Sequence, residues 1–217
     1  MKEKEIKTVI KNSGFLDVYV AEIDKVKPLR IVSQGRKNYI KSCSDENLKR
    51  QRKAVWNLLE NVLSTICEKN LKDLKFYRED SGKWKLATLD IDFSLSHTEK
   101  IVAVAISNKS VGVDVEPIRE IKSKSFIDRF LSQKEKDEYE KATNKDGYLI
   151  KAWTKKESVF KAKNAEYKLT DKEDDYKYTK SLELEFNGEK HYLSVTGEEI
   201  DKLKIIIGTN YEKNLSF

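Results

Sequence analysis

The stretch from Ile101 to Pro117 constrains the fold most, because it holds two apolar segments separated by a turn. Residues 101–107 form the continuous apolar run IVAVAIS, and residues 111–115 have the sequence VGVDV. Short runs rich in β-branched residues are typical of strands, and Asn108–Ser110 between them is typical of a tight turn. We therefore expect two strands here, the first of them buried.

The clearest helix follows Ser44, which we expect to cap it, with Asn47 three positions later. Apolar residues then recur at steps of three and four, which gives the helix one wide apolar stripe. The stripe consists of Val55, Leu58, Leu59, Val62, Leu63 and Ile66. A second strong helix is expected at residues 146–163.

The rest of the chain alternates between short strands and shorter helices. Further strands are expected at residues 15–23, 92–96, 182–186, 191–195 and 203–208, and further helices at residues 125–131 and 134–143. Turns are expected at 80–83 and 187–188, and residues 25–41, with Pro28 and Gly35, are expected to be irregular. This order predicts an α+β fold with helices packed on antiparallel sheets.

Composition limits the class of protein without deciding its function. The chain has 43 Lys and Arg against 37 Asp and Glu, and the resulting net charge of +6 suits phosphates, nucleic acid or an acidic protein, or simply a solvated basic surface. No apolar run approaches the roughly 20 residues that a membrane span needs. We expect a soluble cytoplasmic protein in which Cys43 and Cys67 are reduced.

Asp114 and Glu116 lie two residues apart at an expected strand end, so their carboxylates point to the same side. Two such carboxylates repel each other unless a cation lies between them, and oxygen ligands favour Mg²⁺ or Mn²⁺. Two solvated acids on an exposed strand face are the alternative, and this pattern alone does not decide between them.

Trp153, Glu157 and Lys161 are spaced four residues apart and therefore line one face of the expected helix at 146–163. An aromatic ring, an acid and a base in one stripe could belong to a binding site. A surface Glu–Lys pair beside a core tryptophan explains the same pattern.

Ser96 ends an expected strand and His97 follows it, in the segment FSLSH. A Ser–His pair at such an edge can donate hydrogen bonds to phosphate oxygens. A catalytic Ser–His dyad is disfavoured, because adjacent strand residues point to opposite faces and no G-x-S-x-G segment is present. A turn-capping serine beside a half-exposed histidine is the structural alternative, and we expect the other histidine, His191, to be structural.

In this order, the segments FSLSH, GVDVE and WTKKESVFK resemble the motifs of the Sfp-type family of 4′-phosphopantetheinyl transferases. Further matches are Gly82-Lys83 before the first motif, Arg129–Ser132 with Glu135, and Arg52 near the start of the long helix. The resemblance covers residues 36–163, and its motifs are specific as a set and not singly.

The resemblance implies an enzyme that transfers the 4′-phosphopantetheine arm of coenzyme A to a serine of an apo acyl or peptidyl carrier protein and releases 3′,5′-ADP. It implies that Asp114, Glu116 and Glu157 hold Mg²⁺, or Mn²⁺, beside the coenzyme A pyrophosphate. It also implies that Glu157 acts as the general base, either directly or through a metal-bound water, and that Lys161 contacts the pyrophosphate.

The family binds the 3′-phosphate of coenzyme A through a Ser–His pair and a basic N-terminal cluster. The matching coenzyme-binding residues here, beside Asp114 and Lys161, are Ser96, His97, Arg36, Lys37, Arg52 and Lys83. Each of the basic residues could instead be a solvated surface side chain.

Chain length selects a type within this superfamily. Short members have about half this length and assemble as trimers, whereas long members fold two similar halves into one chain. The 217 residues imply the long type: a monomer with pseudo-twofold symmetry and an active site between its halves. We expect residues 1–107 to bind the coenzyme phosphates, and residues 108–217 to supply the metal site and the catalytic helix.

Residues 118–131 follow Glu116 directly and mix basic and apolar side chains. We expect them to help form the docking surface for an acidic carrier protein, whose approach a basic surface would accelerate.

The chain departs from the family pattern at several positions. Trp84 stands where proline is usual and Ser94 where asparagine is frequent, and Asn164 and Glu166 replace the glycines that usually follow the catalytic helix. A catalytically silent coenzyme A-binding homologue is therefore an alternative. A nucleic-acid-binding module is suggested by charge alone, and without an aromatic platform or DNA-reading motif we expect no nucleic-acid partner and no membrane partner.

Overall fold

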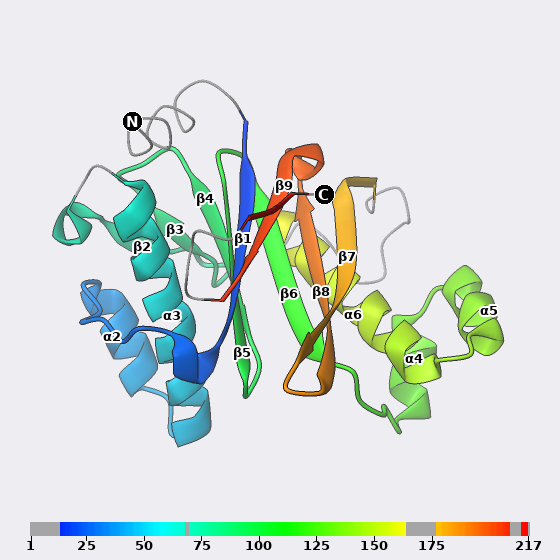
Figure 1. Ribbon diagram of the computed structural model, residues 1–217. Helices are drawn as coiled ribbons and strands as arrows, with labels where there is room; N and C mark the ends of the chain where they lie inside the picture. The colour runs from blue at the N-terminus through cyan, green and yellow to red at the C-terminus, as the bar shows by residue number, and fades with distance from the viewer. Residues whose placement is uncertain (1–13, 68–69, 164–176, 209–213, 217) are drawn as a thin grey trace.

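Two β-sheets lie in the middle of the molecule, and helices flank them on both sides (Figure 1). The computed structural model describes residues 14–67, 70–163, 177–208 and 214–216. Within these residues helices and strands are mixed along the chain, which confirms the expected α+β class. No helix among them is both long enough and apolar enough to cross a bilayer.

The first sheet has five strands in the order β10-β9-β1-β5-β4. Its strands are β1 (Leu16–Glu22), β4 (Asp92–His97), β5 (Ile101–Ser107), β9 (Leu203–Ile207) and β10 (Asn214–Ser216). All neighbours are antiparallel except β1 and β9, which are parallel. Helix α3 (Glu46–Ile66) packs on β4 and β5, and α2 (Gln34–Lys41) contacts α3.

The second sheet has the order β6-β8-β7 and is antiparallel throughout. Its strands are β6 (Val111–Pro117), β7 (Thr179–Phe186) and β8 (Glu189–Gly197). Helix α6 (Lys145–Lys163) packs on β6 and β8, and α4 (Lys124–Phe130) and α5 (Gln133–Lys141) form a lobe beside it (Figure 1). The chain therefore changes sheets between Ser107 and Val111, and β9 and β10 return to the first sheet.

Strand β5 is buried on both faces, as its continuous apolar run predicts. Val102, Val104 and Ile106 pack in a cluster with α3, whereas the alternate residues of β5 pack against the second sheet. The expected stripe of α3 is confirmed at the first five of its six positions, which are fully buried: Val55, Leu58, Leu59, Val62 and Leu63. The central sheet is thus held between a helix and a second sheet.

Gly112 lets β6 approach α6 closely. A Cβ atom at this position would lie 1.9 Å from the carbonyl oxygen of Ser158 and 2.6 Å from the backbone nitrogen of Ala162. Both are backbone atoms of the helix, so a flexible side chain cannot give way. The glycine of the GVDVE motif therefore sets the distance between the strand that carries Asp114 and the helix that carries Glu157.

Side-chain oxygens join β4 to β6, which belong to different sheets. Alternate residues of β4 accept hydrogen bonds from alternate backbone N–H groups of β6, in the pairs Asp92 with Val111 (3.0 Å), Ser94 with Val113 (3.0 Å) and Ser96 with Val115 (3.2 Å). We call these three contacts the β4–β6 bridge. The bridge satisfies backbone donors at an edge of the second sheet and brings the FSLSH segment beside the GVDVE strand.

A buried lysine fastens the α4–α5 lobe to α6. Lys156 is 2% exposed, and its Nζ donates to the Phe130 carbonyl (2.6 Å) and to Glu135 (2.8 Å). Glu135 also forms a capping box with Ser132 at the start of α5. The Arg129–Ser132 segment with Glu135 therefore has a structural function in this chain.

Several expectations for the first half were wrong in detail. Asp45 caps α3, because its carboxylate accepts from the Leu48 N–H, and Ser44 lies one residue before it. Part of the region expected to be irregular forms α2, which Ser33 caps and which contains Gly35. The turn at 80–83 is confirmed, and it joins a hairpin that was not expected, formed by β2 (Phe76–Arg78) and β3 (Trp84–Leu86).

The second half follows the expected elements closely. Helices α4, α5 and α6 and strands β7, β8 and β9 lie where they were expected, with ends displaced by a few residues. Asn187 and Gly188 form the expected hairpin turn with positive φ angles of 51° and 77°. Neither Cys43 nor Cys67 forms a disulfide.

Candidate active site

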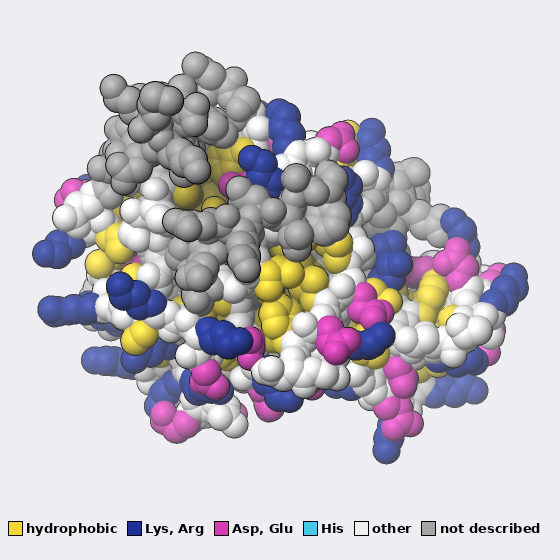
Figure 2. Space-filling view, in the orientation of Figure 1, with side chains coloured by type: hydrophobic (Ala, Val, Ile, Leu, Met, Phe, Trp, Pro, Cys, Tyr) yellow, Lys and Arg dark blue, Asp and Glu magenta, His cyan; other side chains and the backbone are white. Residues whose placement is uncertain are grey.

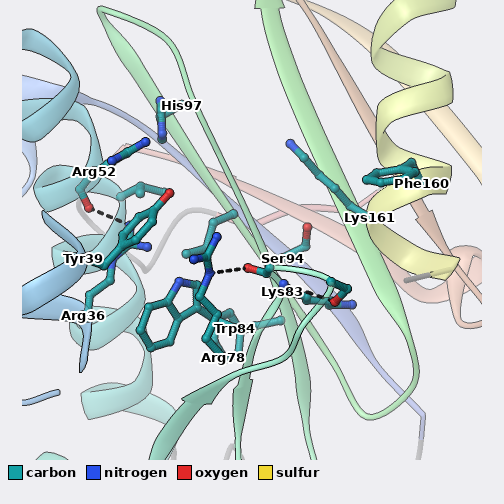
Figure 3. Close-up of a pocket in the computed structure, with 15 residues that line it drawn as sticks. Arg36, Tyr39, Arg52, Arg78, Lys83, Trp84, Ser94, His97, Phe160 and Lys161 are labelled. Atoms are coloured by element: carbon teal, nitrogen blue, oxygen red, sulfur yellow. Dashed lines mark hydrogen bonds between the residues drawn. The ribbon is translucent and has the colours of Figure 1, made fainter. Parts of the chain in front are cut away.

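A pocket of about 310 Å³ opens between α2, α3, the β2–β3 hairpin, β4 and the end of α6 (Figure 3). It therefore collects side chains from both flanking helix layers. Its lining residues are Arg36, Tyr39, Arg52, Val55, Arg78, Ser81, Gly82, Lys83, Trp84, Phe93, Ser94, Leu95, His97, Phe160 and Lys161. Five of these are Lys or Arg and none is Asp or Glu, so the pocket suits an anion.

Three arginines gather around the ring of Tyr39 on one wall (Figure 3). The guanidinium carbons of Arg52, Arg78 and Arg36 lie 4.5, 4.7 and 5.0 Å from the ring centroid. Arg36 is 4% exposed and also stacks on Trp56 and Trp84. Burial lowers the pKa of Arg36 to about 10, and the positive charges of Arg52 and Arg78 contribute to the decrease.

The two lysines of the pocket differ from the arginines because each has a carboxylate partner. Lys83 Nζ lies 2.6 Å from Asp92, and Lys161 Nζ lies 2.7 Å from Asp114. No ion pair joins any of the three arginines to an acid within the described residues. The positive charges of the pocket that have no carboxylate partner are therefore those of the three arginines around Tyr39.

His97 ends β4 at the rim of this pocket. Its Nδ1 lies 3.0 Å from Gln51 Oε1, and the ring is partly buried. Burial lowers the pKa of His97 to about 4, and the positive charges of Lys161, Arg36 and Arg52 add to the effect. The imidazole is therefore neutral at physiological pH and donates from one nitrogen.

We expect the His97 ring to titrate near pH 4 in the free protein and at higher pH once 3′,5′-ADP is bound, because phosphate charge offsets the neighbouring cations. The folded-state pKa lies below the ordinary 6.5, so the unfolded chain binds more protons between these values, and the contribution of His97 to stability falls as the pH drops through that window. Histidine NMR titration checks this, with a His97→Asn variant to assign the signal. A midpoint near 6.5 in the free protein would contradict it.

The three acids of the sequence motifs lie around Lys161 and the end of β6. Asp114 is 4% exposed; its Oδ1 accepts from Lys161 and from Ser96 at 2.9 Å, while its Oδ2 is buried without a hydrogen-bond partner in the described structure. Burial raises the pKa of Glu116 to about 7, and the negative charges of Asp114 and Glu157 contribute to the increase. Burial, and then Asp114, also raises the pKa of Glu157.

This donor set fits a hard divalent cation in chemistry and in charge. The buried Asp114 Oδ2 has no hydrogen-bond partner in the described structure, and a cation would relieve the mutual repulsion of the acids. However, no group of three His, Cys, Asp or Glu side chains in the described ranges converges closely enough to count as a metal site. The ligand set Asp114, Glu116 and Glu157 therefore stays a prediction.

Comparison with known proteins finds a similarity in the second half of the chain. Residues 110–210 match the family model described as the 4′-phosphopantetheinyl transferase superfamily. The match contains GVDVE and WTKKESVFK and confirms the resemblance that the motifs indicated.

Two curated relatives are similar over 110 residues. The 4′-phosphopantetheinyl transferase gsp of Aneurinibacillus migulanus is 36% identical, over 48% of this chain and 44% of its own length. The 4′-phosphopantetheinyl transferase Sfp of Bacillus subtilis (strain 168) is 30% identical, over 48% of this chain and 47% of its own length. The alignments thus span about half the length of the relatives.

The structure brings together most of the residues that the superfamily resemblance singled out. Arg36, Arg52, Lys83, His97 and Lys161 all line the pocket. Lys37 is half-buried outside the lining, and its charge acts on Glu60. Ser96 also lies outside the lining and bonds to Asp114 and to the Val115 N–H. Asn164 and Glu166, where this superfamily usually has glycines, lie outside the described residues.

Sequence reasoning did not identify Tyr39 and Arg78, and noted Trp84 only as a departure from the family. Tyr39 lies in α2 and Arg78 in β2, two elements that were not expected. Arg78 also donates to the Gly82 carbonyl, which holds the turn beside the pocket. A hairpin assignment around the Asp80–Lys83 turn would have been the one signal that pointed to Arg78.

Proposed function

We propose that the chain is a 4′-phosphopantetheinyl transferase, which moves the phosphopantetheine arm of coenzyme A to a serine of an apo acyl or peptidyl carrier protein. The observation that carries the proposal is a pocket with three uncompensated arginines, separated from a cluster of acids by Lys161. A phosphorylated nucleotide fits the pocket, and a diphosphate that extends from it would reach the acids. The family match of residues 110–210 supports the same activity.

The reaction is a displacement at the β-phosphorus of coenzyme A. The carrier serine Oγ forms a bond to that phosphorus, its proton passes to the Glu157 carboxylate, and the bond to the bridging oxygen breaks so that 3′,5′-ADP leaves with the electron pair. The raised pKa of Glu157 favours proton acceptance. Lys161 steadies the negative charge that develops on the 5′-phosphate of the leaving 3′,5′-ADP, and the arginines hold the 3′-phosphate.

Asp114, Glu116 and Glu157 are the residues that would hold Mg²⁺ or Mn²⁺. When bound, the ion supplies positive charge that stabilises the diphosphate in the transition state. Glu116 needs such a cation most, because burial and its acidic neighbours raise its pKa to about 7. Lys161 offsets part of the charge on Asp114 without the ion.

The two halves of the chain share an arrangement that supports a pseudo-twofold fold with the site between them. In the first, β5 lies between β1 and β4 and α3 covers the sheet; in the second, β8 lies between β6 and β7 and α6 covers the sheet. Residues 1–107 supply the arginine cluster, and residues 108–217 supply the acids and Lys161. A monomer satisfies this arrangement, with β9 and β10 as the crossover between the halves.

The carrier protein would dock on residues 118–131 and the adjoining lobe. Arg119 lies 4.0 Å from Glu116, so this surface adjoins the acids, and Lys122 is exposed. Figure 2 shows both basic and acidic side chains on the α4–α5 lobe. An acidic carrier protein would therefore meet a surface of mixed charge in which Arg119 lies beside the acid Glu116.

The deciding experiment incubates the full chain with coenzyme A, Mg²⁺ and a panel of apo carrier proteins, and measures their intact masses. A mass increase of one phosphopantetheine group that EDTA abolishes supports the proposal. Coenzyme A binding without any mass increase across the panel would favour the catalytically silent homologue. Retention of DNA without coenzyme A binding would favour the nucleic-acid module.

Arg52 and Arg50 provide a matched test of the anion pocket, because they lie two residues apart on α3. Arg52 faces the pocket, whereas Arg50 is exposed and pairs with Asp24. We expect Arg52→Gln to weaken 3′,5′-ADP binding by about 10- to 100-fold, the value of a charged hydrogen bond, and Arg50→Gln to leave it within about twofold. Calorimetry checks this, and equal losses in both variants would show a diffuse charge effect instead.

A further inference from the structure

Helix α6 meets strand β8 partly through hydroxyl groups, although contacts between a helix and a sheet are usually apolar. Thr154 and Ser158 lie four residues apart on the helix and are fully buried. Their side chains contact Ser194 and Thr196 of β8, which are also buried. Burying a hydroxyl is costly unless it is hydrogen-bonded, so the partners of these four residues are informative.

The first set of contacts extends from β7 through β8 to the helix. Ser181 Oγ lies 2.7 Å from Ser194 Oγ, and Ser194 Oγ lies 2.7 Å from Thr154 Oγ1. Thr154 donates its own hydrogen to the Lys151 carbonyl at 3.1 Å. Because a hydroxyl has one hydrogen, Thr154 accepts from Ser194, and Ser194 in turn accepts from Ser181.

The second set repeats this arrangement about one helical turn further along α6. Thr179 Oγ1 lies 2.8 Å from Thr196 Oγ1, and Thr196 Oγ1 lies 2.8 Å from Ser158 Oγ. Ser158 donates to the Lys155 carbonyl at 2.8 Å. We call the two sets the hydroxyl chains. All hydrogens in each chain point from the sheet towards the helix, so each chain is satisfied in one arrangement of α6 on the sheet.

The hydroxyl chains lie level with the GVDVE motif. In the β6–β8 pairing, Ser194 is opposite Asp114, and Thr196 is opposite Gly112. Gly112 lies against the Ser158 carbonyl, because a Cβ atom there would come within 1.9 Å of that oxygen. The glycine therefore limits how near α6 comes to β6, whereas the hydroxyl chains restrain the position of the helix along the strands.

Helix α6 carries its reactive side chains beside this contact. Glu157 directly precedes Ser158, and Lys161 Nζ donates to the Val113 carbonyl at 3.1 Å and to Asp114 Oδ1 at 2.7 Å. Apolar packing is not directional, whereas hydrogen bonds weaken steeply when their geometry changes. A shift of the helix along the sheet would therefore break the hydroxyl chains before it lost much apolar contact.

We propose that Thr154 and Ser158 are positioning residues, which fix α6 along β8 through the hydroxyl chains and so hold Glu157 and Lys161 in place beside β6. The inference rests on the proposed function where it concerns the rate of transfer, whereas the contact of Lys161 with Asp114 can be measured without it. A misplacement of 1 Å can cost about 100-fold in rate. Two buried polar chains at this contact thus contribute precision that an apolar contact lacks.

The main test replaces the four inner hydroxyls together with apolar groups of similar size. The four-site variant carries Thr154→Val, Ser158→Ala, Ser194→Ala and Thr196→Val, so both partners of each helix–strand hydrogen bond are removed together. Such paired replacements are nearly neutral, and we expect a melting temperature within about 4 °C of the wild type. The kcat of carrier-protein modification should fall by about 10- to 100-fold, while the KM for coenzyme A stays within about threefold.

A second measurement follows Lys161 itself and needs no enzymatic activity. Trace labelling with acetic anhydride, quantified by mass spectrometry, compares Lys161 with the exposed Lys72. In the wild type the Lys161 amine is held by Asp114 and by the Val113 carbonyl, so its labelling should be slow. The four-site variant should label Lys161 about 10-fold faster, the value of a lost charged hydrogen bond.

The outer hydroxyls provide the matched control. Ser181 and Thr179 are half-buried on β7, and the double variant Ser181→Ala with Thr179→Val leaves both contacts between β8 and α6 intact. It should keep the wild-type kcat and Lys161 labelling within about twofold. Thr154→Ser, which retains the hydroxyl, should keep most of the activity that Thr154→Val loses.

Wild-type kcat and Lys161 labelling in a folded four-site variant would overturn the inference, as would equal losses in the Ser181→Ala and Thr179→Val double variant. A loss of 3′,5′-ADP affinity as large as the loss of kcat would show general disorder and would also overturn it. If the four-site variant does not fold, Thr154→Val and Thr154→Ser decide by the same comparison. A wild-type chain that modifies no carrier protein refutes the proposed function, and the labelling of Lys161 still decides whether the hydroxyl chains position the helix.

Discussion

Replacing Glu157 with glutamine is expected to slow carrier-protein modification by about 100- to 10,000-fold, the usual contribution of a general base. The amide retains the size of the side chain but cannot take the proton of the attacking serine. Glu157 is partly buried on α6, and its burial, followed by the nearby acid Asp114, raises its pKa, so removal of its charge should not destabilise the fold. The rate of mass increase of an apo carrier protein gives the measurement.

The fold and the nucleotide pocket should survive this substitution. The Glu157→Gln variant should keep the wild-type melting temperature and its affinity for 3′,5′-ADP in EDTA, because the arginine cluster is unchanged. Glu185→Gln, at an exposed position of β7, serves as the control and should modify carrier protein at the wild-type rate. Full activity in Glu157→Gln would refute the role assigned to this carboxylate.

Replacing Gly112 with alanine is expected to destabilise the protein by about 3 kcal/mol, at the upper end of overpacking costs, and to abolish transfer. The new Cβ would lie 1.9 Å from the Ser158 carbonyl oxygen, so β6 and α6 must move apart. That movement separates Asp114 on the strand from Glu157 and Lys161 on the helix. Thermal unfolding should show a melting temperature lower by about 6 to 12 °C.

Gly35→Ala is the matched control for this effect. A Cβ at Gly35 would have its nearest neighbour, a ring atom of Trp84, at 3.5 Å, an ordinary contact. Gly35 lies within α2, where alanine is favoured over glycine by about 1 kcal/mol, so this variant should be at least as stable as the wild type. Equal stability of the Gly112→Ala and Gly35→Ala variants would show that the β6–α6 contact is not tight.

The elements that the sequence predicted correctly are those with a strong local pattern. The apolar run of β5 extends over seven residues, and the stripe of α3 extends over several helical turns. Both patterns are therefore long enough to be recognised in the sequence. The missed elements, α2, β2 and β3, have eight, three and three residues, too few for a stripe or an alternation to stand out in the sequence. Their stability comes from packing on Trp56 and Trp84, which local patterns do not reveal.

The candidate site divides in the same way. The acids and Lys161 belong to local motifs and could be named from the sequence, whereas Arg78 and Tyr39 enter the pocket only through the missed elements. The sequence could not distinguish a paired cation from an unpaired one. Lys83 and Arg52 were equal candidates, and the structure shows that Asp92 neutralises the lysine alone.

The sequence by itself determined the α+β class, the long helices and the three motifs that indicate the superfamily, because each depends on residues close together in the chain. Only the tertiary structure decided which charges lack a partner, how near β6 lies to α6, and that Ser96 bonds to Asp114. These are contacts between residues distant in sequence. Their energies depend on distances that the packing of two sheets sets, and no local pattern contains that information.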